Sequence, residues 1–224
     1  LGYLIDESTI EEAIATSSVE ATRTETLCMW ISALKSPWPH QAFEDLGFAE
    51  LKLEPGRLTI FGMDISVNKK MASLVAGQIM DDGKVGVGVI AQFESQVAID
   101  ELKMAIEVNE WAKQYKPRMI CFDKYATMSV AERLSQSGHK IQDMSGTVFY
   151  QACSDLYDAI VNGRIVHAGQ QTLVDSMNNC AAKESDAGWR IVRRKSAGDV
   201  SAAISLAMVV HQLLKPQSKP QIYV

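Results

Sequence analysis

The chain has 224 residues and is 47% hydrophobic, so it is long enough to bury a substantial core in one main domain with an appendage. Its formal net charge of −5 gives no overall sign of nucleic-acid binding, although a local basic patch can bind DNA on an acidic protein. The four cysteines are widely spaced without a C-x-x-C pair, which argues against a disulfide framework or a zinc site and favours reduced, mostly buried thiols.

Neither a signal peptide nor a membrane-spanning run is visible in the sequence, because no apolar stretch approaches the length needed to cross a bilayer. The chain begins at Leu1 without a methionine, so we expect a fragment or a processed product. The first part is rich in Glu and Thr and is broken by "SPWPH". We interpret residues 1–56 as a helical linker or the tail of a preceding domain, residues 57–215 as the main domain, and residues 216–224 as a frayed tail.

Three short β-rich stretches open the main domain, at residues 58–67, 73–80 and 84–93. The segment "DDGK" between the second and third stretches is typical of a hairpin turn. The first and third stretches are apolar on both faces, which favours strands that are covered by helices on both sides.

Helices and strands then alternate along the chain. Residues 97–116 carry apolar side chains at helical spacing and stop before Pro117, which predicts an amphipathic helix. The later elements follow from similar patterns. We expect a strand at 118–123, a helix at 129–138, a strand at 140–144, a helix at 147–163, short edge strands at 164–168 and 188–195 with a helix at 170–183 between them, and a small-residue helix at 199–214.

Three antiparallel strands followed by β-α-β crossovers predict an α/β fold with a mixed five-stranded sheet and helices on both faces. This order of elements is that of the ribonuclease H-like fold. In such a sheet the first and fourth strands are neighbours, and the last helix packs across them.

Three aspartates occupy special positions in this plan. Asp64 lies inside the first strand, Asp123 ends the fourth strand, and Asp199 opens the final helix. Three carboxylates that converge in a dry site cannot all ionise unless a cation compensates them. Hard oxygen ligands favour Mg²⁺ or Mn²⁺, and two such ions about 4 Å apart can activate a water and stabilise the leaving oxygen of a phosphodiester. The pattern therefore predicts a two-metal site.

Each aspartate also has a simpler structural interpretation. Asp64 could pair with a buried lysine or arginine, and Asp123 could be a strand-end turn residue. Asp199 could sit in a capping box whose N-cap is Ser196. Asp143, after the fifth strand, is a possible extra ligand, but we expect a surface position for it.

The segments "FGMDIS", "FDKYAT" and "GDVSAAISLAMVV" together resemble the nuclease domain of the large terminase subunit of tailed bacteriophages. The stretch "IVNGRIVHAGQQTLVDSMNNCAAK", which leads into "GWRIVRRKSAGDVSAAISLAM", is similar to a segment that this family has before its last acidic helix. The N-terminal "TLCMWISALKSPWPHQAFEDL" resembles the connection after the terminase ATPase domain. The resemblance thus covers most of the chain.

The resemblance implies the C-terminal domain of an ATP-driven packaging motor, which cuts concatemeric viral DNA with Mg²⁺ or Mn²⁺ at Asp64, Asp123 and Asp199. It further implies double-stranded DNA, the portal protein and the small terminase subunit as partners, with no membrane partner, and action in the host cytoplasm. No G-x-x-x-x-G-K-[ST] loop is present, because "GQIMDDGKV" has one residue too many between its glycines. We therefore expect this chain to cut DNA without translocating it.

DNA binding would depend on two local basic clusters that border the acidic site and hold phosphates. The cluster residues are Lys69, Lys70, Arg190, Arg193, Arg194 and Lys195. The family also carries a histidine in the segment of His167, for which we expect a hydrogen-bonded structural role.

Other functions remain open at this level. A Holliday-junction resolvase or a transposase also uses three carboxylates to bind metal ions. An ATP-binding domain of the actin and sugar-kinase type also has an aspartate in its first strand, before a hairpin. The latter fold needs a glycine-rich phosphate turn, which "DISVNKK" does not offer. A non-catalytic docking module is the third alternative.

Overall fold

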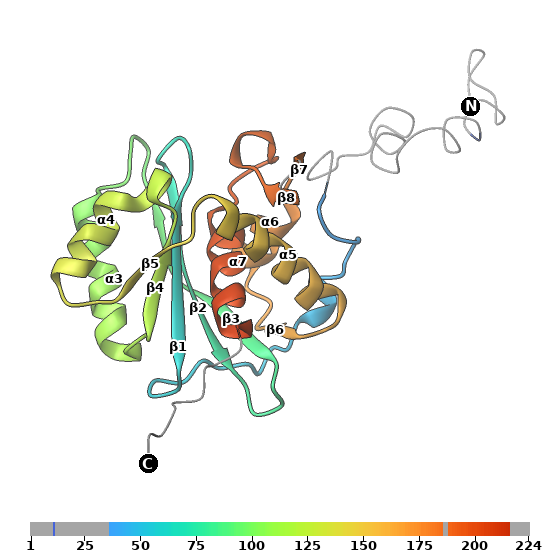
Figure 1. Ribbon diagram of the computed structural model, residues 1–224, viewed down its shortest axis with the longest axis horizontal. Helices are drawn as coiled ribbons and strands as arrows, with labels where there is room; N and C mark the ends of the chain where they lie inside the picture. The colour runs from blue at the N-terminus through green and yellow to red at the C-terminus, as the bar shows by residue number, and fades with distance from the viewer. Residues whose placement is uncertain (1–10, 12–35, 186–187, 216–224) are drawn as a thin grey trace.

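The computed structural model describes residue 11 and residues 36–185 and 188–215. Two layers of helices enclose a twisted central sheet (Figure 1). The predicted N-terminal helix and the predicted tail at 216–224 lie outside the described residues.

The central sheet has six strands instead of the five predicted from the sequence. Its order is β5-β4-β1-β2-β3-β6, and β1 is antiparallel to β2 but parallel to β4. The first five strands follow the predicted ribonuclease H-like order, and the sixth pairs in parallel with β3 at one edge. The strands are β1 (Thr59–Ile65), β2 (Met71–Ile79), β3 (Val85–Glu94), β4 (Met119–Phe122), β5 (Ile141–Asp143) and β6 (Ile165–His167).

Helices cover both faces of the sheet, as the sequence predicts. One face packs against α3 (Glu101–Tyr115) and α4 (Lys124–Gln136), and this layer contains a core that includes Phe61 and Met63. The opposite face carries the larger core, and a second layer of helices covers it (Figure 1). Its elements are α5 (Thr147–Val161), α6 (Gln171–Asn178) and α7 (Ser201–Leu214).

The second expected edge strand does not join the central sheet. It forms β8 (Gly188–Ile191), which pairs with β7 (Ala182–Ser185) in a separate two-stranded sheet. The helix predicted at 170–183 ends at Asn178, where the chain turns toward β7. A 3₁₀ turn, η3 (Arg193–Lys195), follows β8 and leads the chain toward α7.

Helix α7 is buried on nearly all sides because it lies between the sheet and α5 and α6. Its small side chains allow this, and so does Gly62 of β1. A Cβ atom at Gly62 would lie 2.4 Å from the backbone oxygen of Ser205, so only glycine permits this approach. The close packing brings the start of α7 to the end of the sheet where β1 and β4 finish.

Part of the predicted linker belongs to the core of the main domain. Trp38 and Phe43 are buried, and the Trp38 indole N–H donates to the carbonyl of Met177 at 3.0 Å. A short 3₁₀ turn, η2 (Glu44–Leu46), follows Phe43. The division of the chain at residue 57 itself stays a prediction.

Three cysteines lie in the described part of the chain, namely Cys121, Cys153 and Cys180, and all three are buried free thiols as expected. Burial raises the pKa of the Cys121 thiol to about 12, which makes it unreactive at neutral pH. Within residues 36–185 and 188–215, no helix combines the length and the apolar character needed to cross a membrane.

Candidate active site

The structure brings Asp64 and Asp123 together at one end of the sheet. Asp64 lies near the end of β1 and is 0% exposed, while Asp123 follows β4 directly. Strands β1 and β4 are parallel neighbours, and Met63 stands opposite Phe122. The residues that follow these two, Asp64 and Asp123, therefore lie side by side at the same edge of the sheet. Asp123 is also the N-cap of α4, where its Oδ1 accepts from the Tyr125 N–H at 3.0 Å.

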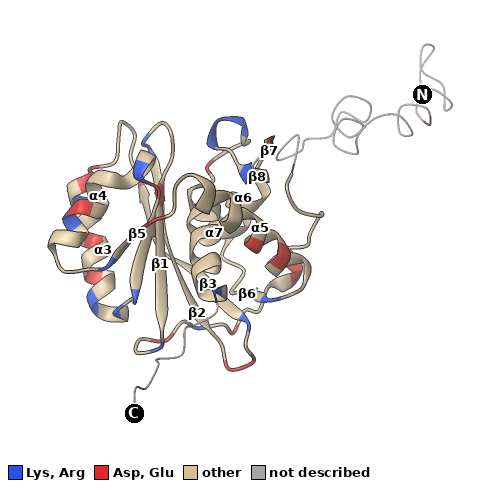
Figure 2. Cartoon of the chain, in the orientation of Figure 1, with Lys and Arg blue, Asp and Glu red and all other residues tan. Residues whose placement is uncertain are grey.

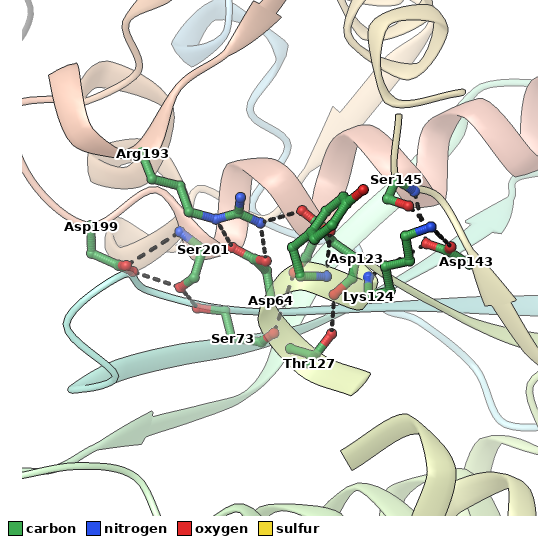
Figure 3. Close-up of polar contacts among 12 residues, drawn as sticks. Asp64, Ser73, Asp123, Lys124, Thr127, Asp143, Ser145, Arg193, Asp199 and Ser201 are labelled. Atoms are coloured by element: carbon green, nitrogen blue, oxygen red, sulfur yellow. Dashed lines mark hydrogen bonds and ion pairs between the residues drawn. The ribbon is translucent and has the colours of Figure 1, made fainter. Parts of the chain in front are cut away.

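Arg193 of η3 contacts both carboxylates (Figure 3). Its Nε donates to Asp64 Oδ2 at 3.1 Å, and its Nη2 donates to Asp64 Oδ1 at 2.5 Å. The same Nη2 donates to Asp123 Oδ2 at 2.9 Å. One cationic group therefore bridges the two aspartates, and both oxygens of Asp64 are hydrogen bonded. The sequence allowed Asp64 to pair with a buried lysine or arginine, and in this structure Arg193 is that partner.

Asp199 reaches the same region from the other side (Figure 3). Its Oδ2 accepts from the Ser201 hydroxyl at 2.6 Å, and that hydroxyl lies 2.9 Å from the hydroxyl of Ser73. Ser73 stands opposite Asp64 in the β1–β2 register. A short polar chain thus links Asp199 to the strand position beside Asp64.

The capping-box alternative for Asp199 is wrong. The N-cap of α7 is Val200, and the Ser196 hydroxyl instead donates to the Val192 carbonyl at 2.6 Å. The same hydroxyl accepts from the Ala181 N–H at 3.1 Å. Ser196 therefore fastens the turn that carries Arg193, and Asp199 Oδ1 accepts from the N–H of Ser201, the first residue of α7, at 3.3 Å.

The electrostatics of the site are those of a crowded acidic pocket. Burial raises the pKa of Asp64 to about 6, Arg193 opposes this shift, and the charges of Asp123 and Asp199 add to it. Burial alone would lower the pKa of Arg193, but the two carboxylates outweigh it and raise that pKa. The three aspartates therefore interact electrostatically, and an ionised Asp64 needs a cation beside it.

A pocket of about 400 Å³ opens over this cluster. Asp64, Arg193, Asp199 and Ser201 line it, together with the turn after β1. The three carboxylates supply hard oxygen donors, and the bridging guanidinium shows that the arrangement accepts a cation between Asp64 and Asp123. In this state of the described chain, however, no three acidic, histidine or cysteine side chains stand close enough together to hold a metal ion.

The predicted basic residues divide into different environments. Lys69 pairs with Glu101 at 2.8 Å, Arg190 lies over the ring of Tyr150, and Arg193 belongs to the carboxylate cluster instead of an exposed basic surface. The remaining three, Lys70, Arg194 and Lys195, are exposed. Basic side chains are among those coloured in the loop that follows β8 (Figure 2).

The two secondary candidates do not join the cluster. Asp143 ends β5 and accepts from the Ser145 N–H at 2.9 Å and the Ser145 hydroxyl at 3.0 Å. Although burial alone would raise the pKa of Asp143, these hydrogen bonds lower it. His167 is buried at the far edge of the sheet, stacks on Phe43 and bonds its carbonyl at 2.9 Å, which agrees with the expected structural role.

Sequence reasoning missed Ser73 and Ser201, the two hydroxyls that connect Asp199 to the β1–β2 pair. The register of the predicted hairpin could have placed Ser73 opposite Asp64. Ser201, two residues after Asp199, carries no such signal, because serine is common at the start of helices.

The raised pKa of Asp64 predicts a particular pH dependence of stability in the metal-free protein. Between pH 3.8, the ordinary pKa of an aspartate, and about pH 6, Asp64 is protonated in the folded state but ionised in the unfolded state. Its contribution to the free energy of unfolding therefore increases as pH falls through this range. We expect Asp64→Asn to be more stable than wild type at pH 7.5, and the gap to shrink at pH 5. Urea unfolding of both proteins in EDTA measures this, and a gap that is equal at both pH values would contradict it.

A scan of the sequence against known protein families finds no match, and a search of curated proteins finds no relative. Solved structures do match. The HK97 bacteriophage large terminase is 15% identical with a TM-score of 0.68 over 95% of this chain and 52% of that chain. The large terminase nuclease from thermophilic phage G20c is 17% identical with a TM-score of 0.58 over 77% of this chain and 98% of that chain.

The G20c nuclease solved with bound magnesium matches with 16% identity and a TM-score of 0.58, over 76% of this chain and 96% of that chain. The chain therefore spans about half the length of the HK97 large terminase and nearly all of the separate nuclease domain. At these identities the likeness shows the fold, which is the ribonuclease H-like fold of the large terminase nucleases.

Proposed function

We propose that this chain is a metal-dependent endonuclease that cleaves concatemeric double-stranded viral DNA during genome packaging, by two-metal phosphodiester hydrolysis at Asp64, Asp123 and Asp199. The observation that carries the proposal is that Asp64 and Asp123 share one cation, Arg193, and that Asp64 and Arg193 line a pocket together with Asp199. The fold of the large terminase nucleases supports it.

Asp64, Asp123 and Asp199 would hold Mg²⁺ or Mn²⁺. Two observations support this: Arg193 joins the carboxylates of Asp64 and Asp123, and Asp199 lines the same pocket as Asp64. When bound, the two ions supply an activated water and charge stabilisation of the leaving oxygen. The magnesium-bound G20c nuclease supports a divalent ion for this fold.

The chain itself supplies a fixed frame for this chemistry. Asp64 sits on a strand that pairs on both sides, so its position is rigid. The N–H of Tyr125 orients Asp123 through Oδ1 and leaves its Oδ2 directed toward Asp64's partner, Arg193. Asp199 is held by Ser201 at the opposite wall of the pocket, where a DNA phosphate would enter.

The wider setting belongs to the same proposal. This chain matches about half of the HK97 large terminase, and in the complete motor residues 1–56 would be the linker or tail of a preceding ATPase domain. The portal protein and the small terminase subunit would then be partners, and cutting would occur in the host cytoplasm.

The direct functional test is plasmid cleavage. We expect the purified chain to nick and linearise supercoiled plasmid in Mn²⁺ or Mg²⁺ and to leave it intact in EDTA. Absence of any cutting with either metal would sink the proposal. Cutting confined to four-way junctions would favour a resolvase instead.

DNA affinity should depend on the exposed basic residues beside the pocket. Arg194→Ala with Lys195→Ala is expected to weaken DNA binding and to reduce the slope of log affinity against log salt by roughly 2 units, since each lost phosphate contact removes about 0.9. Fluorescence anisotropy with a labelled duplex across a salt series measures the slope.

The matched control removes two exposed lysines from the opposite end of the sheet. Lys84 lies between β2 and β3 and lines a groove together with Leu51 and Met80, and Lys52 is the exposed residue that follows Leu51. Their double replacement by alanine changes the net charge equally and should leave the slope unchanged. Equal slopes for both double variants would remove Arg194 and Lys195 from the DNA interface.

A further inference from the structure

Arg193 occupies the position where the proposed function requires a metal. Its guanidinium is hydrogen bonded to both oxygens of Asp64 and to Asp123 Oδ2. The remaining oxygen of Asp123 is used by the Tyr125 N–H. A divalent ion that binds Asp64 and Asp123 would therefore approach carboxylate oxygens that Arg193 already contacts.

Charge reinforces this competition. Asp64 is fully buried, so its ionised form needs a neighbouring cation, and Arg193 provides one in the metal-free state. A divalent ion and a guanidinium at the same oxygens would repel each other, because both are positive and the site excludes much of the solvent. The two cations are thus alternatives for the same place.

The way Arg193 is mounted allows it to leave. Its side chain is 22% exposed and lines the pocket, so the guanidinium has a path toward solvent. The backbone on either side is fixed, since Ser196 bonds Val192 and Ala181, and the Val192 N–H donates to the Ala181 carbonyl at 3.0 Å. A rotation of the long side chain alone would free the carboxylates.

We infer that Arg193 is a positioning residue that holds Asp64 and Asp123 in the metal-free chain and is displaced when a divalent ion binds. This inference rests on the proposed function. Metal entry is then an exchange of one cation for another, and the released guanidinium is left at the mouth of the pocket, where a DNA phosphate would neutralise it.

The exchange is measured by isothermal titration calorimetry with Mn²⁺ on wild type, Arg193→Gln, Arg193→Lys and Arg194→Gln. We expect Arg193→Gln to bind Mn²⁺ about tenfold more tightly than wild type, because the internal competitor is gone. Arg193→Lys keeps the charge without the planar fork and should fall between them. Arg194→Gln loses the same charge from the same turn and should bind as wild type does.

Nuclear magnetic resonance gives a second readout, and it is made on the wild-type protein. The Arg193 Nε–H signal, identified by its loss in Arg193→Lys, should be protected from solvent exchange in EDTA. Titration with Mg²⁺ should abolish that protection over the concentration range in which the metal binds.

The outcomes separate the two proposals. Unchanged or weaker Mn²⁺ binding by Arg193→Gln, or an Nε–H signal that stays protected at saturating Mg²⁺, overturns the inference and leaves the nuclease proposal intact. Displacement of Arg193 without plasmid cleavage overturns the nuclease proposal alone. Failure of wild type and Arg193→Gln to bind any Mn²⁺ overturns both.

Discussion

Asp64→Asn should reduce plasmid cutting by about 100-fold or more at saturating Mn²⁺, while the protein stays folded. The asparagine keeps the shape of the side chain but removes the charge that a metal requires. Because burial raises the pKa of Asp64, the neutral side chain should also be tolerated in the core. Single-turnover cleavage with thermal unfolding of the same samples measures both effects.

Asp143→Asn is the matched control for this experiment. Asp143 also ends a parallel strand and stands opposite Phe122 in the β4–β5 register, but its carboxylate contacts Ser145 and Lys124. We expect its cleavage rate to stay within about twofold of wild type. Equal loss in Asp143→Asn and Asp64→Asn would show that the effect is general to this end of the sheet and would contradict the role given to Asp64.

Gly62→Ala should destabilise the domain by about 3 kcal/mol, which lowers the melting temperature by roughly 10 °C for a domain of this size. The new methyl group would stand 2.4 Å from the Ser205 carbonyl and 2.8 Å from Val209, so α7 would have to move away from β1. Asp199 precedes α7 and would move with it. Differential scanning calorimetry in EDTA measures the loss.

Gly86→Ala separates this packing effect from the general effect of replacing a strand glycine. Its added methyl group would meet the flexible thioether of Met80, which can turn aside, instead of a backbone atom. We expect a loss of less than about 1 kcal/mol for Gly86→Ala. A similar loss of stability in both variants would contradict the claim that Gly62 is needed for the close approach of α7 to β1.

Much of the fold was predictable from local patterns. The "DDGK" turn and the apolar stretches around it predicted the β1–β2–β3 meander, and the stop at Pro117 predicted the end of α3. The meander with its crossovers then placed β1 beside β4, which brings Asp64 next to Asp123. These features depend on periodicity and chain connectivity, both of which a sequence displays directly.

The parts that failed depend on contacts between distant segments. A short edge strand was expected at 164–168, but its three residues give no sign of which strand it joins, and it pairs in parallel with β3. The burial of Trp38 depends on a partner at Met177, far away in the sequence. Such pairings leave no local pattern.

Arg193 shows the same limit at the candidate site. Next to Arg194 and Lys195 it looks like one member of a basic run for DNA. Only the turn that Ser196 fastens directs its guanidinium onto Asp64 and Asp123, while its neighbours stay exposed. The sequence therefore allowed a buried basic partner for Asp64, but it did not identify that partner as Arg193 or show that Arg193 also contacts Asp123.

The location of a bound metal tests the central claim most directly. Crystals of the protein soaked in Mn²⁺ should give an anomalous scattering peak about 2.1 Å from carboxylate oxygens of Asp64 and Asp123, with the Arg193 guanidinium turned away from both. A peak elsewhere on the protein, with Arg193 still bridging the two aspartates at saturating Mn²⁺, would contradict the account.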